Sequence, residues 1–178
     1  CSSDLMLRVL ILIILLLFSY NKNVYSEEKI VFIDLNYIFI NSKAGKDLNS
    51  RVDDLSIELD KKIKLFKEEI ELKKNKLISQ KNVLSPEEYN KKIKKLEKDI
   101  NEKNLSISKK KKELSLFKTK GEKEFFNQLN AIIENYSVSN SIGIILKKDD
   151  LLMAKKDLDI TKNIFNLFNE KVNKININ

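Results

Sequence analysis

Lysine is the residue type that could do most of the chemistry in this sequence of 178 residues. Residues 61–120 carry 20 lysines against nine acidic residues, a net charge of +11, whereas the whole chain carries +8. Seven of these lysines flank the single proline, Pro86: Lys73, Lys74, Lys76, Lys91, Lys92, Lys94 and Lys95. An ammonium group on a long methylene stem can cover apolar surface while its charge stays in water. The pattern therefore indicates reversible binding rather than covalent chemistry.

Side chains suited to catalysis or metal binding are scarce. The sequence has no histidine, no tryptophan and one cysteine, Cys1, which removes most routes to metal binding, thiol chemistry and imidazole catalysis. Ala44–Lys46 resembles the end of a phosphate loop, but Ile40 stands where that motif needs glycine and Asp47 where it needs serine or threonine. We therefore predict a protein that is not an enzyme and uses no cofactor.

The sequence around the proline predicts the start of a helix. Ser85 suits the N-cap position, Pro86 the first helical position, and Glu88 completes a capping box. Leu84 and Tyr89 supply the two halves of a hydrophobic staple. A kink within one continuous helix would not need these devices together. We expect the chain to reverse between two helices, with the tip near residues 82–86.

Apolar residues recur at helical spacing on both sides of this tip. The upstream set is Leu48, Val52, Leu55, Leu59, Ile63, Phe66 and Ile70. The downstream set forms two heptad rows, Ile93, Ile100, Ile107 and Leu114 in one, and Tyr89, Leu96 and Phe117 in the other, with Lys103 and Lys110 interrupting the second. The pattern predicts an antiparallel helical hairpin over residues 45–121, with arms of about 55 Å and a thin apolar seam.

The two ends of the sequence predict a body for this hairpin. Short strands are expected at Lys29–Asp34, Ile142–Leu146 and Leu151–Ala154. A richer apolar stripe beyond Gly121 and a last helix capped by Asp159 would cover them. Residues 27–44 and 122–178 should thus form a β-rich body within a mostly helical α+β fold. Three short strands make a marginal monomer, so we expect oligomerisation through this body. The candidate residues are Ile30, Phe32, Ile142, Ile144, Leu146 and Leu152.

The N-terminal sequence predicts export. Val9–Phe18 is a run of ten apolar residues, which fits a signal peptide and is too short to span a bilayer comfortably. We expect residues 1–26 to be this signal, with an upstream extension before Met6, and cleavage between Ser26 and Glu27. The mature chain would then lack cysteine, and therefore disulfides.

Three segments resemble the Skp/OmpH family of periplasmic chaperones. They are KIVFIDLNYIFINSKAGKDL at residues 29–48, LSPEEY at the tip, and IGIILKKDDLLMAKKDLDIT at residues 142–161. The resemblance implies a homotrimer whose hairpins project as tentacles around a client cavity. It also implies an ATP-independent holdase in the periplasm that binds unfolded outer-membrane β-barrel proteins and prevents their aggregation in transit. The seven lysines near the tip, with Leu84 and Tyr89, are the candidate client contacts.

Other classes of function fit the sequence less well. An exported coiled-coil protein that acts as a structural or tethering element of the cell envelope is the main alternative. Nucleic-acid binding would suit a basic coiled coil, but the predicted export argues against it. Contact with anionic lipid is a secondary expectation from the positive charge of the arms.

Overall fold

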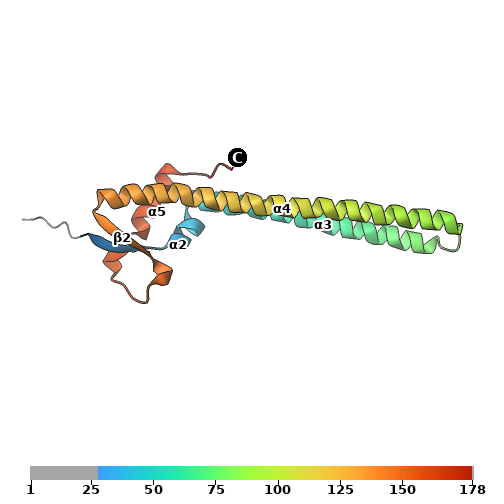
Figure 1. The fold of residues 1–178 in the computed structure, drawn as a ribbon, viewed down its shortest axis with the longest axis horizontal. Helices are drawn as coiled ribbons and strands as arrows, with labels where there is room; N and C mark the ends of the chain where they lie inside the picture. Colours follow the sequence, from blue (N-terminus) through green and yellow to red (C-terminus); the bar gives the residue numbers. More distant parts are fainter. Residues whose placement is uncertain (1–27, 178) are drawn as a thin grey trace, which may run out of the picture.

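The computed structural model describes residues 28–177, and it consists of a long helical hairpin that projects from a small body (Figure 1). The elements in chain order are β1 (Lys29–Ile33), α2 (Leu35–Asn41), α3 (Lys43–Ser79), α4 (Pro86–Ser139), β2 (Ile142–Lys147), the 3-10 helices η1 (Lys148–Asp150) and η2 (Lys156–Leu158), and α5 (Thr161–Lys171). The predicted α+β, mostly helical fold is confirmed. The predicted signal peptide and its cleavage site lie outside the described residues.

The hairpin is formed by α3 and the first two thirds of α4. α3 has 37 residues, which gives an arm of about 55 Å, and α4 has 54 residues because it continues past the hairpin into the body. The seam between the arms is thin: within residues 49–120, Ile70 is the only buried side chain. Most of the other predicted seam residues are half-buried, and Leu55 is exposed.

The tip has the predicted capping box. The Ser85 side chain accepts a hydrogen bond from the Glu88 backbone N–H at 3.3 Å, and the Glu88 carboxylate accepts one from the Ser85 backbone N–H at 3.4 Å. Pro86 occupies the first turn of α4. Lys92 donates a hydrogen bond to the Gln80 side chain across the turn at 3.0 Å. The two bonds between Ser85 and Glu88 satisfy backbone N–H groups at the point where the chain reverses, and the bond from Lys92 joins side chains of the two arms.

The body contains a two-stranded parallel sheet of β1 and β2. The whole hairpin is the connection between these strands, so it returns the chain to the body with the second strand running in the same direction as the first (Figure 1). Val31 and Ile33 face the helices and are buried, while Ile30 is exposed on the other face. The sheet therefore has one covered face and one face that is open except at Phe32, which is 8% exposed.

The predicted third strand at Leu151–Ala154 is wrong. The structure places the short helix η1 immediately before this segment, and Leu151–Ala154 has no strand geometry. A strand needs a neighbour for its backbone groups, and Leu152 and Met153 instead extend into solvent. Phe32 pairs with Asp159 as an isolated bridge, so the later part of the loop returns to the sheet.

A short helix, α2, was not expected from the sequence. Asp34 is its N-cap, and the Asp34 side chain accepts a hydrogen bond from the Tyr37 backbone N–H at 2.7 Å. Ser42 then ends α2 and caps α3, accepting a hydrogen bond from the Gly45 backbone N–H at 3.1 Å. A Cβ atom at Gly45 would lie 1.7 Å from the carbonyl oxygen of Phe39, so this sharp junction requires glycine.

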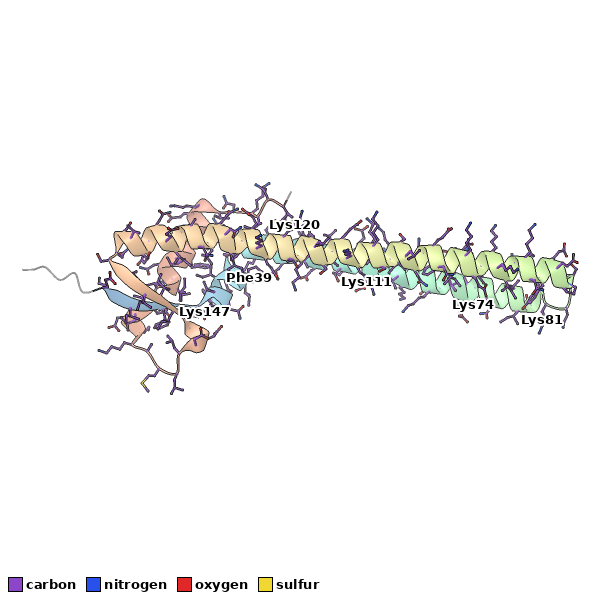
Figure 2. The ribbon with its side chains drawn as sticks, in the orientation of Figure 1. Phe39, Lys74, Lys81, Lys111, Lys120 and Lys147 are labelled. Atoms are coloured by element: carbon purple, nitrogen blue, oxygen red, sulfur yellow. The ribbon has the colours of Figure 1, made fainter. Side chains whose placement is uncertain are left out.

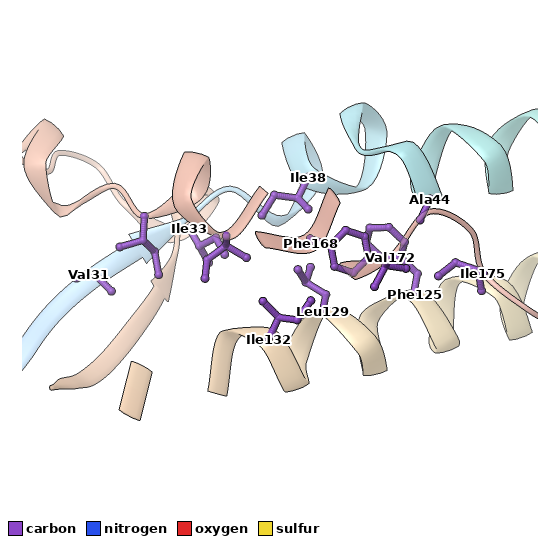
Figure 3. Packing of buried hydrophobic residues seen from close by; sticks show 12 residues of the cluster. Val31, Ile33, Ile38, Ala44, Phe125, Leu129, Ile132, Phe168, Val172 and Ile175 are labelled. Atoms are coloured by element: carbon purple, nitrogen blue, oxygen red, sulfur yellow. The ribbon is translucent and has the colours of Figure 1, made fainter. Parts of the chain in front are cut away.

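The hydrophobic core joins segments that are far apart in the sequence, as predicted (Figure 3). Phe125 of α4 lies at its centre, with ring centroids 4.9 Å from Phe39 and 4.8 Å from Phe168 of α5. The cluster consists of Val31, Ile33, Ile38, Ala44, Phe125, Leu129, Ile132, Ile160, Ile164, Phe168, Val172 and Ile175. This dense base contrasts with the thin seam of the hairpin.

The start of α5 lies close to the predicted cap. The N-cap position is taken by Ile160, which has no side-chain cap, and Asp159 precedes it. The Asp159 carboxylate accepts a hydrogen bond from the Thr161 backbone N–H at 2.9 Å. The prediction that Asp159 is the N-cap is therefore wrong by one residue, although the Asp159 side chain still binds a backbone N–H of the first turn.

Candidate binding grooves along the hairpin

Grooves between α3 and α4 are the main concave features of the arms. Two of them lie in the middle of the hairpin, with volumes of about 280 and 430 Å³, and they share Leu59, Lys62 and Lys110. A third groove, of about 480 Å³, lies near the tip. The first is lined by Leu55, Glu58, Leu59, Lys62, Lys110, Glu113, Leu114 and Phe117; the second by Leu59, Lys62, Leu65, Phe66, Glu69, Lys103, Ser106, Ile107 and Lys110; the third by Lys73, Lys76, Leu77, Gln80, Lys92, Lys95, Leu96 and Asp99.

The two middle grooves lie where lysines occupy positions at which a tighter coiled coil would place apolar residues. The predicted heptad row is interrupted at Lys103 and Lys110. The Lys103 ammonium lies 5.9 Å from the centroid of the Phe66 ring, close enough for a cation–π contact. Because a lysine stem fills less of the seam than a large apolar side chain would, the apolar floor stays partly open.

Some of the lysines at the groove rims form ion pairs with glutamates on the same helix. Glu69 and Lys73 are 2.6 Å apart, and Lys110 and Glu113 are 2.8 Å apart. The hydrogen bond within each pair lowers the pKa of the glutamate and raises the pKa of the lysine. The raised pKa keeps Lys73 and Lys110 charged at neutral pH. Lysine side chains project along both arms, from Lys120 near the base to Lys81 at the tip (Figure 2).

The structure brings together four of the seven lysines singled out in the sequence. Lys73, Lys76, Lys92 and Lys95 surround the tip groove, with Leu77 and Leu96 among its lining residues. Lys74, Lys91 and Lys94 are exposed but do not line this groove. Leu84 and Tyr89 are half-buried at the tip, as expected for the two halves of a staple.

The sequence pattern was not used to predict the two middle grooves. Leu55, Leu59 and Phe117 were assigned to the seam, and no binding role was considered for their surroundings. The signal was present in the pattern, because Lys103 and Lys110 interrupt the downstream row opposite this part of α3. A lysine in a core row marks a place where the seam cannot close.

The six candidate oligomerisation residues divide by exposure. Ile30, Ile144, Leu146 and Leu152 are exposed apolar side chains, the first three of them on the sheet. Phe32 is buried, and Ile142 is half-buried against the core, so these two contribute less open surface. The open face of the sheet is therefore apolar.

Another hollow, of about 640 Å³, lies beside the start of α5. Its lining combines Asp34 and Asp159 with Lys148, Lys156 and Lys162, so charges of both signs meet there. Within residues 28–177, no group of histidine, cysteine, aspartate or glutamate side chains could hold a metal ion. None of the helices in that range is long and apolar enough to cross a membrane.

Most of the chain matches the model of one known protein family. The model of the family described as "Outer membrane protein (OmpH-like)" matches residues 29–167. The chain belongs to the OmpH-like family. The match begins at β1 and ends within α5, so it includes both strands and the whole hairpin. A search of curated proteins gives no match.

A solved structure shares the OmpH-like fold of this chain. It is the crystal structure of a candidate outer membrane chaperone (OmpH-like) from Caulobacter crescentus. The TM-score is 0.77 at 12% sequence identity, and the alignment covers 85% of this chain and 89% of the other. At this identity the likeness concerns the fold, and it includes the long hairpin on a small body.

Proposed function

We propose that this OmpH-like protein is an ATP-independent holdase that binds unfolded outer-membrane β-barrel proteins and prevents their aggregation in the periplasm. The observation that carries the proposal is the set of grooves along the hairpin, which have apolar residues in their lining and lysines at their rims. Family membership and the chaperone named among similar structures support the same class of function.

The physical mechanism follows from the composition of the grooves. An unfolded membrane protein exposes apolar side chains that cluster with one another in water. Leu59 and Phe66 in the middle grooves, and Leu77 and Leu96 near the tip, offer small apolar surfaces to such side chains. Many weak contacts on one client add up through effective concentration, without fixing one client conformation. No bond is formed or broken, so the proposed activity is not enzymatic and needs no cofactor.

We propose a homotrimer with the body at its centre. Ile30 is 51% exposed, Ile144 49% and Leu146 39%, so a contiguous apolar face of the two-stranded sheet is open in the single chain. A two-stranded sheet is marginal alone, and burial against other copies would stabilise it. The exposed Leu152 and Met153 would extend this surface. Three hairpins would then project from one body and surround a client.

The test of the proposed function is suppression of aggregation by matched variants. A urea-unfolded β-barrel outer-membrane protein is diluted into buffer without nucleotide, and its light scattering is followed with and without the chain from Glu27. The groove variant replaces Lys73, Lys76, Lys92 and Lys95 with glutamine. We expect it to suppress aggregation less than the unaltered chain does, because the groove loses its charged rim but keeps its apolar floor.

The control variant replaces Lys74, Lys81, Lys91 and Lys94 with glutamine. It removes the same charge from exposed positions that do not line the tip groove. Equal losses in both variants would mean that overall charge, and not the groove, attracts the client. Full activity of both would exclude the tip groove as a binding surface.

Contact with anionic lipid is a second proposal from the charge of the arms. With a net charge of +11 between residues 61 and 120, the hairpin should be attracted to vesicles that contain anionic lipid. Binding should weaken as salt is raised, because salt screens exposed charges. Binding that does not depend on salt would contradict an electrostatic contact.

A further inference from the structure

The segment that follows α5, Val172–Ile177, packs back onto the root of the hairpin; we call it the strap. Figure 1 shows it running from α5 along α4 in the direction of the arms. Ile175 is completely buried and Ile177 half-buried, while Asn173, Lys174 and Asn176 between them are exposed. In Figure 3, Ile175 lies between α4 and the start of α3. The strap thus has an inner side that contacts both arms.

Arg51 ties this strap to the arms. Its Nη2 atom donates a hydrogen bond to the carbonyl oxygen of Ile175 at 2.7 Å, and its Nε atom lies 3.1 Å from the Asp47 carboxylate one turn earlier in α3. The guanidinium carbon lies 5.5 Å from the centroid of the Phe117 ring of α4. One side chain therefore contacts α3, α4 and the strap together.

These three contacts account for the choice of arginine. Every basic residue in the described part of the chain is lysine except Arg51. A guanidinium is planar and carries several donors in a fixed fork, so it can bind a carbonyl, pair with a carboxylate and stack on a ring at once. An ammonium group could satisfy one or two of these partners, but it is a compact point charge without the fork that reaches all three at once.

Gly121 brings the same three elements into close contact one turn further along α4. A Cβ atom there would lie 2.5 Å from Cδ1 of Leu48 and 2.9 Å from Cδ1 of Ile177. The absence of a side chain thus allows both α3 and the strap to pack directly on the backbone of α4. Leu48 is buried at this level, whereas the seam beyond Arg51 is mostly half-buried.

We propose that the strap is a clamp that closes the root of the hairpin and sets the point above which the arms move. Arg51 is the positioning residue of this clamp. With the strap seated, α3 and α4 are held against each other from the core up to Arg51 and Phe117. With the strap released, the hairpin pivots closer to the core, so its direction relative to the body becomes less defined. The clamp is a property of the fold, and it stands whether or not the proposed chaperone function is correct.

The test measures the direction of the hairpin relative to the body. Lys94 near the tip and Lys162 on α5 are exposed, and residues 28–177 contain no cysteine, so cysteines placed at these two positions can carry spin labels. Labelled chains are diluted with unlabelled ones, and the distribution of the 94–162 distance is measured by pulsed electron paramagnetic resonance. We expect Arg51→Gln and Ile175→Ser to broaden this distribution, and Arg51→Lys to broaden it less.

Lys174→Gln is the matched control, because Lys174 is an exposed residue of the same strap. Its distribution should equal that of the unaltered chain. Hydrogen exchange of the same variants provides a second measurement: amides of α3 near Leu48 and of α4 near Gly121 should exchange faster in Arg51→Gln, with amides near the tip unchanged. An unchanged distance distribution in both Arg51→Gln and Ile175→Ser would overturn the proposal. Faster exchange throughout the core would also overturn it, since the strap would then support the whole body and not the root.

Discussion

At the scale of single residues, Asp34 connects three parts of the body. Its carboxylate accepts the Tyr37 N–H and lies 3.1 Å from the Lys148 ammonium, while its backbone N–H donates to the Thr161 hydroxyl at 2.9 Å. Burial raises the pKa of Asp34, but the hydrogen bond from Tyr37 and the charge of Lys148 outweigh it, so the pKa is lowered overall. The ionised carboxylate is thus favoured in the folded state.

This lowered pKa predicts a specific dependence of stability on pH. Because the folded-state pKa of Asp34 lies below its ordinary value of 3.8, its contribution is fully present above that value and is lost as the pH falls through the folded-state pKa. Asp34→Asn keeps an N-cap but removes the charge. Denaturant unfolding over a pH series should therefore show a less stable variant at pH 7 and convergence of the two proteins in acid. A constant difference at every pH would contradict this role of the charge.

Comparing Asp34→Ala with Asp34→Asn separates the stability that comes from the N-cap from the stability that comes from the ion pair. Alanine at an N-cap costs about 1 kcal/mol relative to aspartate or asparagine. We expect Asp34→Ala to be less stable than Asp34→Asn by about this amount at every pH, since neither variant carries the charge. Equal stability of the two variants would mean that α2 does not depend on its cap.

At the scale of elements, the tip is held by local contacts. Ser85→Ala removes the acceptor for the Glu88 N–H and should cost about 1 kcal/mol in the stability of the first turn of α4. Hydrogen exchange should therefore accelerate at residues 87–90, and the core around Phe125 should keep its protection. Glu88→Gln is the control, because glutamine can still complete a capping box. An unaltered exchange rate in Ser85→Ala would show that the turn is held by other contacts.

The elements predicted correctly from the sequence are those specified by neighbouring residues. The capping box at Ser85, the helical spacing of apolar residues upstream of it and the heptad rows downstream are local signals, and they predicted the hairpin, its length and its thin seam. The core stripe of α4 and the strand β1 were likewise clear from periodicity. The apolar runs at the two ends of the sequence predicted the body, and the family resemblance implied that three such bodies join.

The elements that were missed or wrong depend on contacts between distant residues. α2 is only seven residues long, and its junction with α3 relies on the close approach of Gly45 to Phe39. Leu151–Ala154 is a short apolar run, but within residues 28–177 it pairs with neither strand of the sheet. The strap could not be predicted, because its anchor is a backbone carbonyl at Ile175, which Arg51 reaches from 124 positions away in the sequence.

At the scale of the whole molecule, stability and binding surface lie in different places. The base has a continuous core around Phe125, whereas the arms carry lysines and partly open grooves. Regions with few buried apolar contacts open at low free-energy cost. We therefore expect the arms to adapt to clients of different size while the body keeps its structure. Scattering profiles that are equally rigid with and without client would contradict this expectation.

A charged residue on the open face of the sheet should prevent the chains from forming an oligomer. Ile144→Asp places a charge in an exposed apolar patch that includes Ile30 and Leu146. Since Ile144 is half exposed in the single chain, the change should leave the fold of one chain intact but prevent burial against another copy. Far-ultraviolet circular dichroism checks the fold, and sedimentation checks the mass. A variant that keeps the mass of the unaltered protein would exclude this face as the interface.

In the proposed function, three copies of this chain hold an unfolded membrane protein without nucleotide. The most direct measurement is multi-angle light scattering on the chain from Glu27, alone and after mixing with a urea-diluted outer-membrane β-barrel protein. We predict the mass of a trimer alone, and of a trimer with bound client in the soluble mixture. A monomer or dimer that leaves the client to aggregate would contradict the proposed function, and would favour a structural or tethering role in the cell envelope.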